Sequence, residues 1–173
     1  TEVVLMSAAE VWFLRAEAAL RGWTEDDPET HYLNGIRAAH EFLGVSSADT
    51  RAYLGHEKVQ FKGSDTEKLG KIITEKYLNF FMQGGNEAYF ELRRTGYPDF
   101  SASLTHNTDQ IYNDGYLPLR YRYPQSEIDN NNAQVSEAIK RLDKGDDRNS
   151  RMWLLQGSDP LFNPAPFPFR YKN

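Results

Sequence analysis

Four histidines are the first residues to test for metal chemistry: His31, His40, His56 and His106. No two of them stand at the H-x-x-x-H or H-x-H spacing that brings two imidazoles to one metal ion. Cysteine is absent, which excludes disulfides, thiolate metal sites and cysteine nucleophiles. We therefore expect no metal site and no cofactor in this chain.

Carboxylates are the next groups that could do chemistry, and the sequence contains 25 Asp and Glu residues. A glycosidase needs two carboxyl groups at a set separation across a cleft, and a sequence alone does not show such a separation. Glu10 and Glu17 share one helix face, which is typical of a solvated face. The sequence also contains no G-x-S-x-G elbow and no phosphate-binding loop. The sequence therefore shows no recognisable catalytic motif.

A charged loop from 143 to 150 has a weak similarity to a calcium-binding loop, because Asp143, Asp147 and Asn149 alternate along it. The EF-hand pattern fails, since Gly145 replaces the second ligand and Leu154 stands where a bidentate Glu is needed. Calcium binding is therefore the less favoured interpretation of this charged loop.

Two segments, 86–96 and 117–128, combine acidic, aromatic and arginine residues. Arg94 and Arg120 are each suited to a forked pair with a carboxylate, because the guanidinium matches carboxylate geometry. The carboxylates considered are Glu87, Glu91 and Glu127. We interpret this pattern as a buried polar network that fixes an irregular part of the chain.

Composition restricts the possible partners. The formal net charge is −5, and the densest basic stretch, Arg120-Tyr121-Arg122, is interrupted by an aromatic residue. Proteins that bind nucleic acid usually carry a basic stripe that neutralises phosphates, so we expect no nucleic-acid partner. The 10 Tyr, 10 Phe and 3 Trp residues have two interpretations, a packed core or rings that stack on flat ligands such as sugars.

Helix signals begin at Ser7, where Ser7 and Glu10 have capping-box spacing. The stretch 8–21 contains good helix formers, and Gly22 stands where helices usually stop. We expect this helix to bury the face formed by Val11, Leu14 and Ala18, with Trp12 beside it.

A second helix follows from Asp27, a suitable N-cap, and ends at Gly44. The two helices are expected to form an antiparallel hairpin, and Ala38-x3-Phe42 resembles the second helix of a tetratricopeptide unit. The stretch 46–63 is less regular.

Three further helices are indicated downstream. Ser64 and Glu67 repeat the capping-box spacing ahead of a helix that ends at Gly84-Gly85. Short helices are expected over 86–94 and about 133–142, with an extended stretch from 117 to 123 between them. The sequence shows no clear domain boundary and no stretch that approaches the roughly 20 apolar residues that span a bilayer.

Three of these segments together resemble one known family. Ala9–Gly22 is similar to the "AE…LAEA…G" helix of SusD-like proteins, and Phe90–Pro98 resembles their "R-R-T-G" signature. Arg122–Glu127, followed by Asn130-Asn131-Asn132, resembles their late "YP-x-x-E…N" motif. The motifs occur in the family's order, and the resemblance covers 5–155. The chain is therefore identified as similar to the SusD/RagB family.

This resemblance implies an all-α fold with a tetratricopeptide-like helical hairpin and long irregular loops. Family chains are several hundred residues longer, so we expect 1–173 to be the C-terminal part of one SusD-like domain. The resemblance also implies a lipoprotein on the extracellular face of the outer membrane, anchored by an N-terminal lipid that is not in this chain. Such a protein binds glycans, and in some members peptides, for a SusC-like TonB-dependent transporter.

Within this chain, aromatic residues in turns or loops are the candidates for stacking on a sugar, with packing as the alternative for each. They are Trp23, Tyr112, Tyr116 and Trp153. Two alternatives to glycan capture stay open, a peptide-binding SusD/RagB homologue and a tetratricopeptide-like module for protein–protein interaction. A glycoside hydrolase is the remaining, less favoured class.

Overall fold

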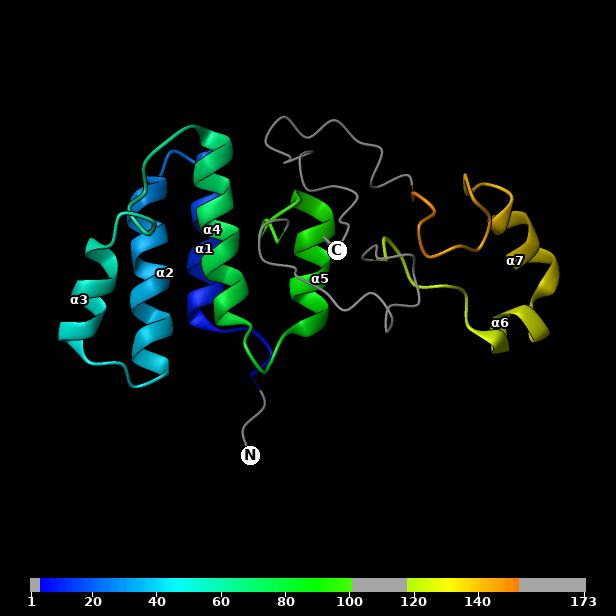
Figure 1. Cartoon of the computed structure of the whole chain (residues 1–173), viewed down its shortest axis with the longest axis horizontal. Helices are drawn as coiled ribbons and strands as arrows, with labels where there is room; N and C mark the ends of the chain where they lie inside the picture. Colours follow the sequence, from blue (N-terminus) through cyan, green and yellow to red (C-terminus); the bar gives the residue numbers. More distant parts are fainter. Residues whose placement is uncertain (1–3, 101–117, 153–173) are drawn as a thin grey trace. The chain divides into compact units, whose positions relative to one another are not determined.

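The computed structural model describes residues 4–100 and 118–152 and contains helices but no strand in those ranges (Figure 1). The chain divides into two compact units, 1–92 and 93–173, which are described separately. The helices are α1 (Ala8–Leu20), α2 (Pro28–Phe42), α3 (Ser47–Gly55), α4 (Asp65–Asn79), α5 (Gly85–Thr95), α6 (Gln125–Asn130) and α7 (Asn132–Ile139). The expected all-α fold is confirmed.

In the first unit, α1 and α2 pack along each other as the expected hairpin, and α4 packs against α1 (Figure 1). α3 lies on the outer side of α2. The side chain of Asn79 at the end of α4 donates to the Ser7 hydroxyl, 2.9 Å away, and so fixes α4 to the start of α1.

The first two helices end in the same way. Gly22 and Gly44 adopt left-handed φ angles of 70° and 71°, which glycine tolerates better than any other residue. The next backbone N–H turns back into the helix, from Trp23 to the Ala18 carbonyl and from Val45 to the His40 carbonyl, both at 2.9 Å. This is the Schellman arrangement, and it confirms both predicted helix stops.

The core of the first unit is built from α1, α2, α4 and the segment between α3 and α4. Phe13 of α1 fits against Gly35 of α2, where a Cβ atom would lie only 2.5 Å from the ring. Tyr32 is fully buried, stacks on Phe61 and donates its hydroxyl to the Val59 carbonyl at 2.9 Å. The hydroxyl is thus paired, as a buried polar group must be.

The predicted buried face of α1 is wrong in its angular position. Val11 and Leu14 are largely exposed, at 42% and 39%, while Ala9, Phe13 and Ala16 form the buried stripe. The small alanines let α2 approach closely, so the helix buries its alanine face and Phe13 rather than its aliphatic face. The prediction that small residues permit a close helix pair is consistent with this packing.

α3 was not predicted, because the stretch 46–63 has too little apolar periodicity for a helix. The structure shows Ser46 as its N-cap, accepting a hydrogen bond from the Asp49 N–H at 3.1 Å. α4 follows with the complete capping box between Ser64 and Glu67 that the sequence predicts. α5 begins at Gly85, one residue before the expected cap.

In the second unit, α6 and α7 form a short helical pair that surrounds the Asn130-Asn131-Asn132 run. The sequence predicts one helix after this run, and α6 before it is additional. The stretch 118–123 is irregular rather than a strand, although Leu119 N–H does donate to the Arg148 carbonyl at 2.8 Å. Over the described ranges, no helix has both the length and the apolar character needed to cross a membrane.

Candidate functional site

Trp23 is the one predicted ligand-stacking residue that lies among the described residues. It follows Gly22 at the end of α1, where the Schellman turn fixes its backbone and directs the chain away from the helix. Its side chain is 72% exposed, which is unusual for the largest aromatic residue. The other three predicted residues, Tyr112, Tyr116 and Trp153, lie outside the described ranges.

The Trp23 ring is supported from within α1. Arg21 places its guanidinium carbon 5.4 Å from the centre of the Trp23 ring, within the range of a cation–π contact. Arg21 is itself held by Glu17, whose carboxylate oxygen lies 2.7 Å from the Arg21 Nε. Both of these charged side chains are almost fully buried, so the cation that supports the indole has a fixed position. We call Glu17, Arg21 and Trp23 the Trp23 platform.

This burial of Glu17 corrects its assignment to a solvated face. Glu17 is only 5% exposed, and its pairing partner Arg21 stands one helical turn later. An acid four residues before an arginine is a common stabilising pair on helices, so the spacing carries a signal for the contact. The spacing carries no signal for the burial of Glu17.

A second group of side chains fixes the connection between α1 and α2 (residues 21–27), which contains Trp23. The Asp26 Oδ2 oxygen lies 3.4 Å from the guanidinium of Arg15 in α1 and 3.1 Å from the Nε2 atom of His31 in α2. Trp12 packs against the His31 ring at 5.4 Å, and the Arg15 guanidinium lies 4.9 Å from the Trp12 ring centre. The connection is thus tied to both helices through one carboxylate.

Both aspartates of this connection keep their negative charge at neutral pH. The contacts of Asp26, first with His31 and then with Arg15, hold its pKa below the ordinary 3.8. Asp27 caps α2, and hydrogen bonds from the Thr30 hydroxyl and backbone N–H lower its pKa as well. The connection therefore presents ionised carboxylates next to the Trp23 platform.

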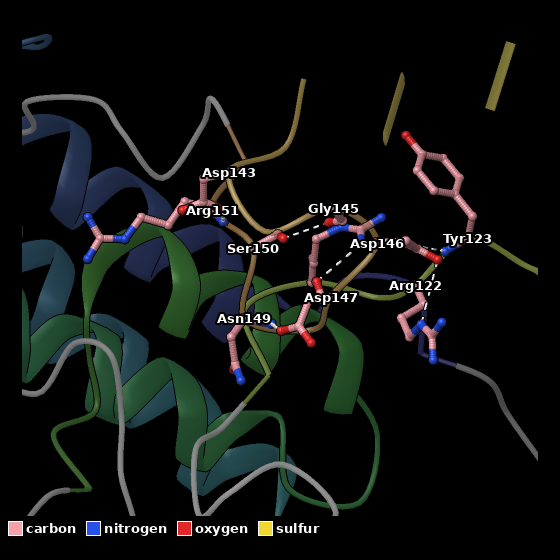
Figure 2. A network of polar contacts seen from close by, with 10 residues as sticks. Arg122, Tyr123, Asp143, Gly145, Asp146, Asp147, Asn149, Ser150 and Arg151 are labelled. Carbon is pink, nitrogen blue, oxygen red and sulfur yellow. Dashed lines mark hydrogen bonds and ion pairs between the residues drawn. The ribbon is translucent and has the colours of Figure 1, made fainter. Parts of the chain in front are cut away.

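In the second unit, a network of polar contacts surrounds Asp146 (Figure 2). One Asp146 oxygen accepts from the buried Arg120 guanidinium at 2.6 Å and from the Tyr123 N–H at 3.1 Å. Burial would raise the pKa of Asp146, but these hydrogen bonds and the charges of Arg120 and Arg122 outweigh it and lower that pKa. The expected polar network around Arg120 exists, with Asp146 as its carboxylate in place of the three that were expected.

The loop 143–151 closes on itself through its own side chains (Figure 2). Asp143 accepts from the Arg151 N–H at 2.9 Å, and Asp147 accepts from the Asn149 N–H at 2.7 Å. The Ser150 hydroxyl donates to the Gly145 carbonyl at 2.7 Å. The carboxylates that suggested calcium thus stabilise turns, and no cluster of three His, Asp or Glu residues suited to a metal occurs over the described ranges.

Comparison with known proteins decides the family. The family model described as SusD-like, starch-binding and associating with the outer membrane, matches residues 1–124. The chain belongs to the SusD-like family. SusD-like proteins bind ligands and are not enzymes, which agrees with the prediction from the sequence. No curated protein matches the chain.

Solved structures support the same family. A SusD homologue from Bacteroides fragilis is 36% identical to this chain, with a TM-score of 0.78. The match covers 89% of this chain and 36% of the length of the homologue. A chitin-binding SusD homologue from Flavobacterium johnsoniae is 28% identical, with a TM-score of 0.69. The match covers 91% of this chain and 37% of the length of that homologue. The chain thus spans little more than a third of the length of these relatives.

Proposed function

We propose that this SusD-like chain belongs to a cell-surface component that captures oligosaccharides for uptake. In this proposal the protein acts on the extracellular face of the outer membrane and delivers its ligand to a SusC-like TonB-dependent transporter. The family's description as starch-binding and its association with the outer membrane support this role. The relative from Flavobacterium johnsoniae, whose ligand is chitin, supports a glycan as the ligand.

The observation that carries the proposal within this chain is the exposed Trp23 ring on a fixed support. One face of an indole that is held in place offers a flat apolar surface at little entropic cost, and the C–H face of a pyranose ring packs on such a surface. The hydroxyl groups around the sugar ring would then meet the polar groups of the same connection, among which are the exposed Thr24 and Glu25. This is the arrangement of a binding platform.

Affinity electrophoresis of the purified protein against a panel of neutral and charged polysaccharides tests this proposal. We expect one class of glycan to retard the protein and to be released unchanged in chain length. Replacing Trp23 with Ala should weaken the retardation by about fivefold or more, taking as a guide the roughly 1–3 kcal/mol that a nucleic-acid base gains by stacking on an aromatic side chain.

Phe81→Ala is the matched control, because Phe81 is an equally exposed ring, at 77%, that has no place in the Trp23 platform. Equal retardation of the wild type and Trp23→Ala would remove Trp23 from the site. A protein retarded by no glycan would contradict glycan capture and shift the assignment toward a peptide ligand.

Delivery to a transporter is tested separately by chemical crosslinking in intact cells, followed by mass spectrometry. We expect crosslinks to a TonB-dependent outer-membrane transporter. Crosslinks confined to other surface proteins would contradict the transporter partnership and leave the glycan-binding assignment standing.

A further inference from the structure

The cation beneath the Trp23 ring is already neutralised. The Arg21 Nε lies 2.7 Å from the Glu17 carboxylate, and the two side chains are 10% and 6% exposed. A guanidinium in this state supports the indole through its charge and its planar face, but its charge is compensated before any ligand arrives. An anionic sugar that stacks on Trp23 therefore gains little from Arg21.

The groups that follow Trp23 along the chain are acidic. Glu25, Asp26 and Asp27 lie in the same short connection and are exposed, and Glu29 follows in the first turn of α2. The charge of Asp26 is partly offset by Arg15, and that of Asp27 by the start of α2. No such contact offsets Glu25 among the described interactions. Glu25 therefore adds an exposed negative charge two residues after Trp23.

We propose that the Trp23 platform selects uncharged glycans and rejects uronate-containing and sulfated ones, and that Glu17 sets this selectivity by neutralising Arg21. The inference rests on the proposed glycan binding and adds the ligand class to it. Its physical basis is like-charge repulsion from the connection, combined with the absence of a compensating cation at the ring. Repulsion between exposed charges is screened by salt, so the selectivity should weaken as ionic strength increases.

A pair of polymers that share one backbone tests the selectivity. The first is the neutral polysaccharide that binds best, and the second is the same polymer after partial oxidation of its C6 hydroxymethyl groups to carboxylates. Isothermal titration calorimetry at low salt should give about tenfold weaker binding for the oxidised polymer. At high salt the difference should shrink markedly.

Glu17→Gln tests the role assigned to Glu17, because it keeps the shape and a hydrogen-bond acceptor but removes the charge that compensates Arg21. This variant should recover most of the lost affinity for the oxidised polymer. Glu10→Gln is the matched control, since it makes the same charge change on the same helix away from the ring, and it should keep the wild-type discrimination. Glu25→Gln supplies an independent test in an exposed position, with a partial gain for the oxidised polymer expected.

The outcomes separate the two proposals. Equal or tighter binding of the oxidised polymer by the wild type would overturn the charge selectivity while glycan binding stands. The oxidised polymer could also bind more weakly in a way that changes neither with salt nor with Glu17→Gln or Glu25→Gln. That result would overturn the charge selectivity, because the loss of affinity would then come from the missing C6 hydroxyl. Failure to bind any neutral polysaccharide would overturn the glycan assignment and the inference together.

Discussion

At the scale of single residues, Glu75 of α4 is an acid whose ionisation is coupled to folding. Its side chain is partly buried and accepts a hydrogen bond from the Tyr53 hydroxyl at 2.9 Å. Burial raises the pKa of Glu75 above its ordinary 4.5, and the Tyr53 hydrogen bond opposes this only in part. The folded protein therefore retains a proton on Glu75 at pH values where the unfolded chain has released it.

This raised pKa predicts a loss of stability with increasing pH. The contribution of Glu75 is fully present below about pH 4.5 and is lost as pH rises through the raised pKa, because the charged form is then buried. Glu75→Gln keeps an acceptor for Tyr53 but does not titrate. Urea unfolding at about pH 4 and about pH 7 should show a smaller decrease in the unfolding free energy for this variant than for the wild type.

Glu57→Gln, a change at an exposed glutamate, is the control for the removal of one charge. It should leave the pH dependence of the wild type in place. Parallel pH profiles for Glu75→Gln and the wild type would show that Glu75 does not carry this dependence.

Individual residues also mark the limit of what the sequence predicts about the site. The exposure of Trp23 could be predicted because it stands in a turn directly after a helix-ending glycine, whereas its role in ligand binding stays a prediction. The burial of Glu17 and the pairing of Arg120 with Asp146 could not be found, since both depend on how distant segments close over a charge. For Arg120 the partner is 26 residues away, beyond the local spacing rules that pointed to Glu127.

At the scale of elements, helix ends were predictable and helix faces were less so. Ser64, Asp27, Gly22 and Gly44 act through local backbone hydrogen bonds, so the sequence around each is sufficient to place it. α3 escaped prediction because its stability depends on packing beside α2, and it contains no fully buried residue. The exposed Val11 and Leu14 show that apolar spacing alone does not say which side of a helix meets its neighbour.

The α1–α2 contact depends on one glycine, and this gives a prediction for the element. A Cβ atom at Gly35 would approach three atoms of the Phe13 ring to within 2.5–2.9 Å. Phe13 is 1% exposed and belongs to the packed core of the first unit, so the ring shifts only at the expense of its neighbours. Gly35→Ala should therefore lower the unfolding free energy by about 1–3 kcal/mol, despite the better helix propensity of alanine.

Gly55→Ala is the matched control, because Gly55 ends α3 and a Cβ atom there meets nothing within 4 Å. Urea unfolding should show that this second substitution is neutral or slightly stabilising. Equal effects of the two alanines would mean that the hairpin shifts to accommodate Gly35→Ala, and that the close approach to Phe13 is not what determines its stability.

At the scale of the whole chain, the resemblance identified the family correctly because three separated motifs occur in one order. Such motifs specify a fold, since they mark helix packing and the polar network around Arg120. They do not specify which apolar residues are left uncovered. Burial of an apolar side chain is a property of all the segments that surround it, and it is therefore visible only in the structure.

The first unit leaves a contiguous apolar surface at the ends of α2 and α4. Leu5, Leu43 and Phe81 are 94%, 67% and 77% exposed, and with Phe42 and Leu78 they line a pocket of about 110 Å³. Exposed apolar patches of this kind favour association with other surfaces. The isolated chain should therefore self-associate at high concentration, as measured by sedimentation velocity, and should bind the dye ANS.

Replacing Leu43 and Phe81 with Ser should reduce both effects without lowering stability, because neither side chain is buried in the first unit. Val11→Ser removes a half-exposed apolar side chain that does not line this pocket, and it should leave self-association as in the wild type. A wild-type chain that stays monomeric across the concentration range would show that the exposed apolar residues do not mediate self-association. If the double variant instead loses stability in urea, Leu43 or Phe81 contributes to packing within the unit, and its exposure does not reflect a free surface.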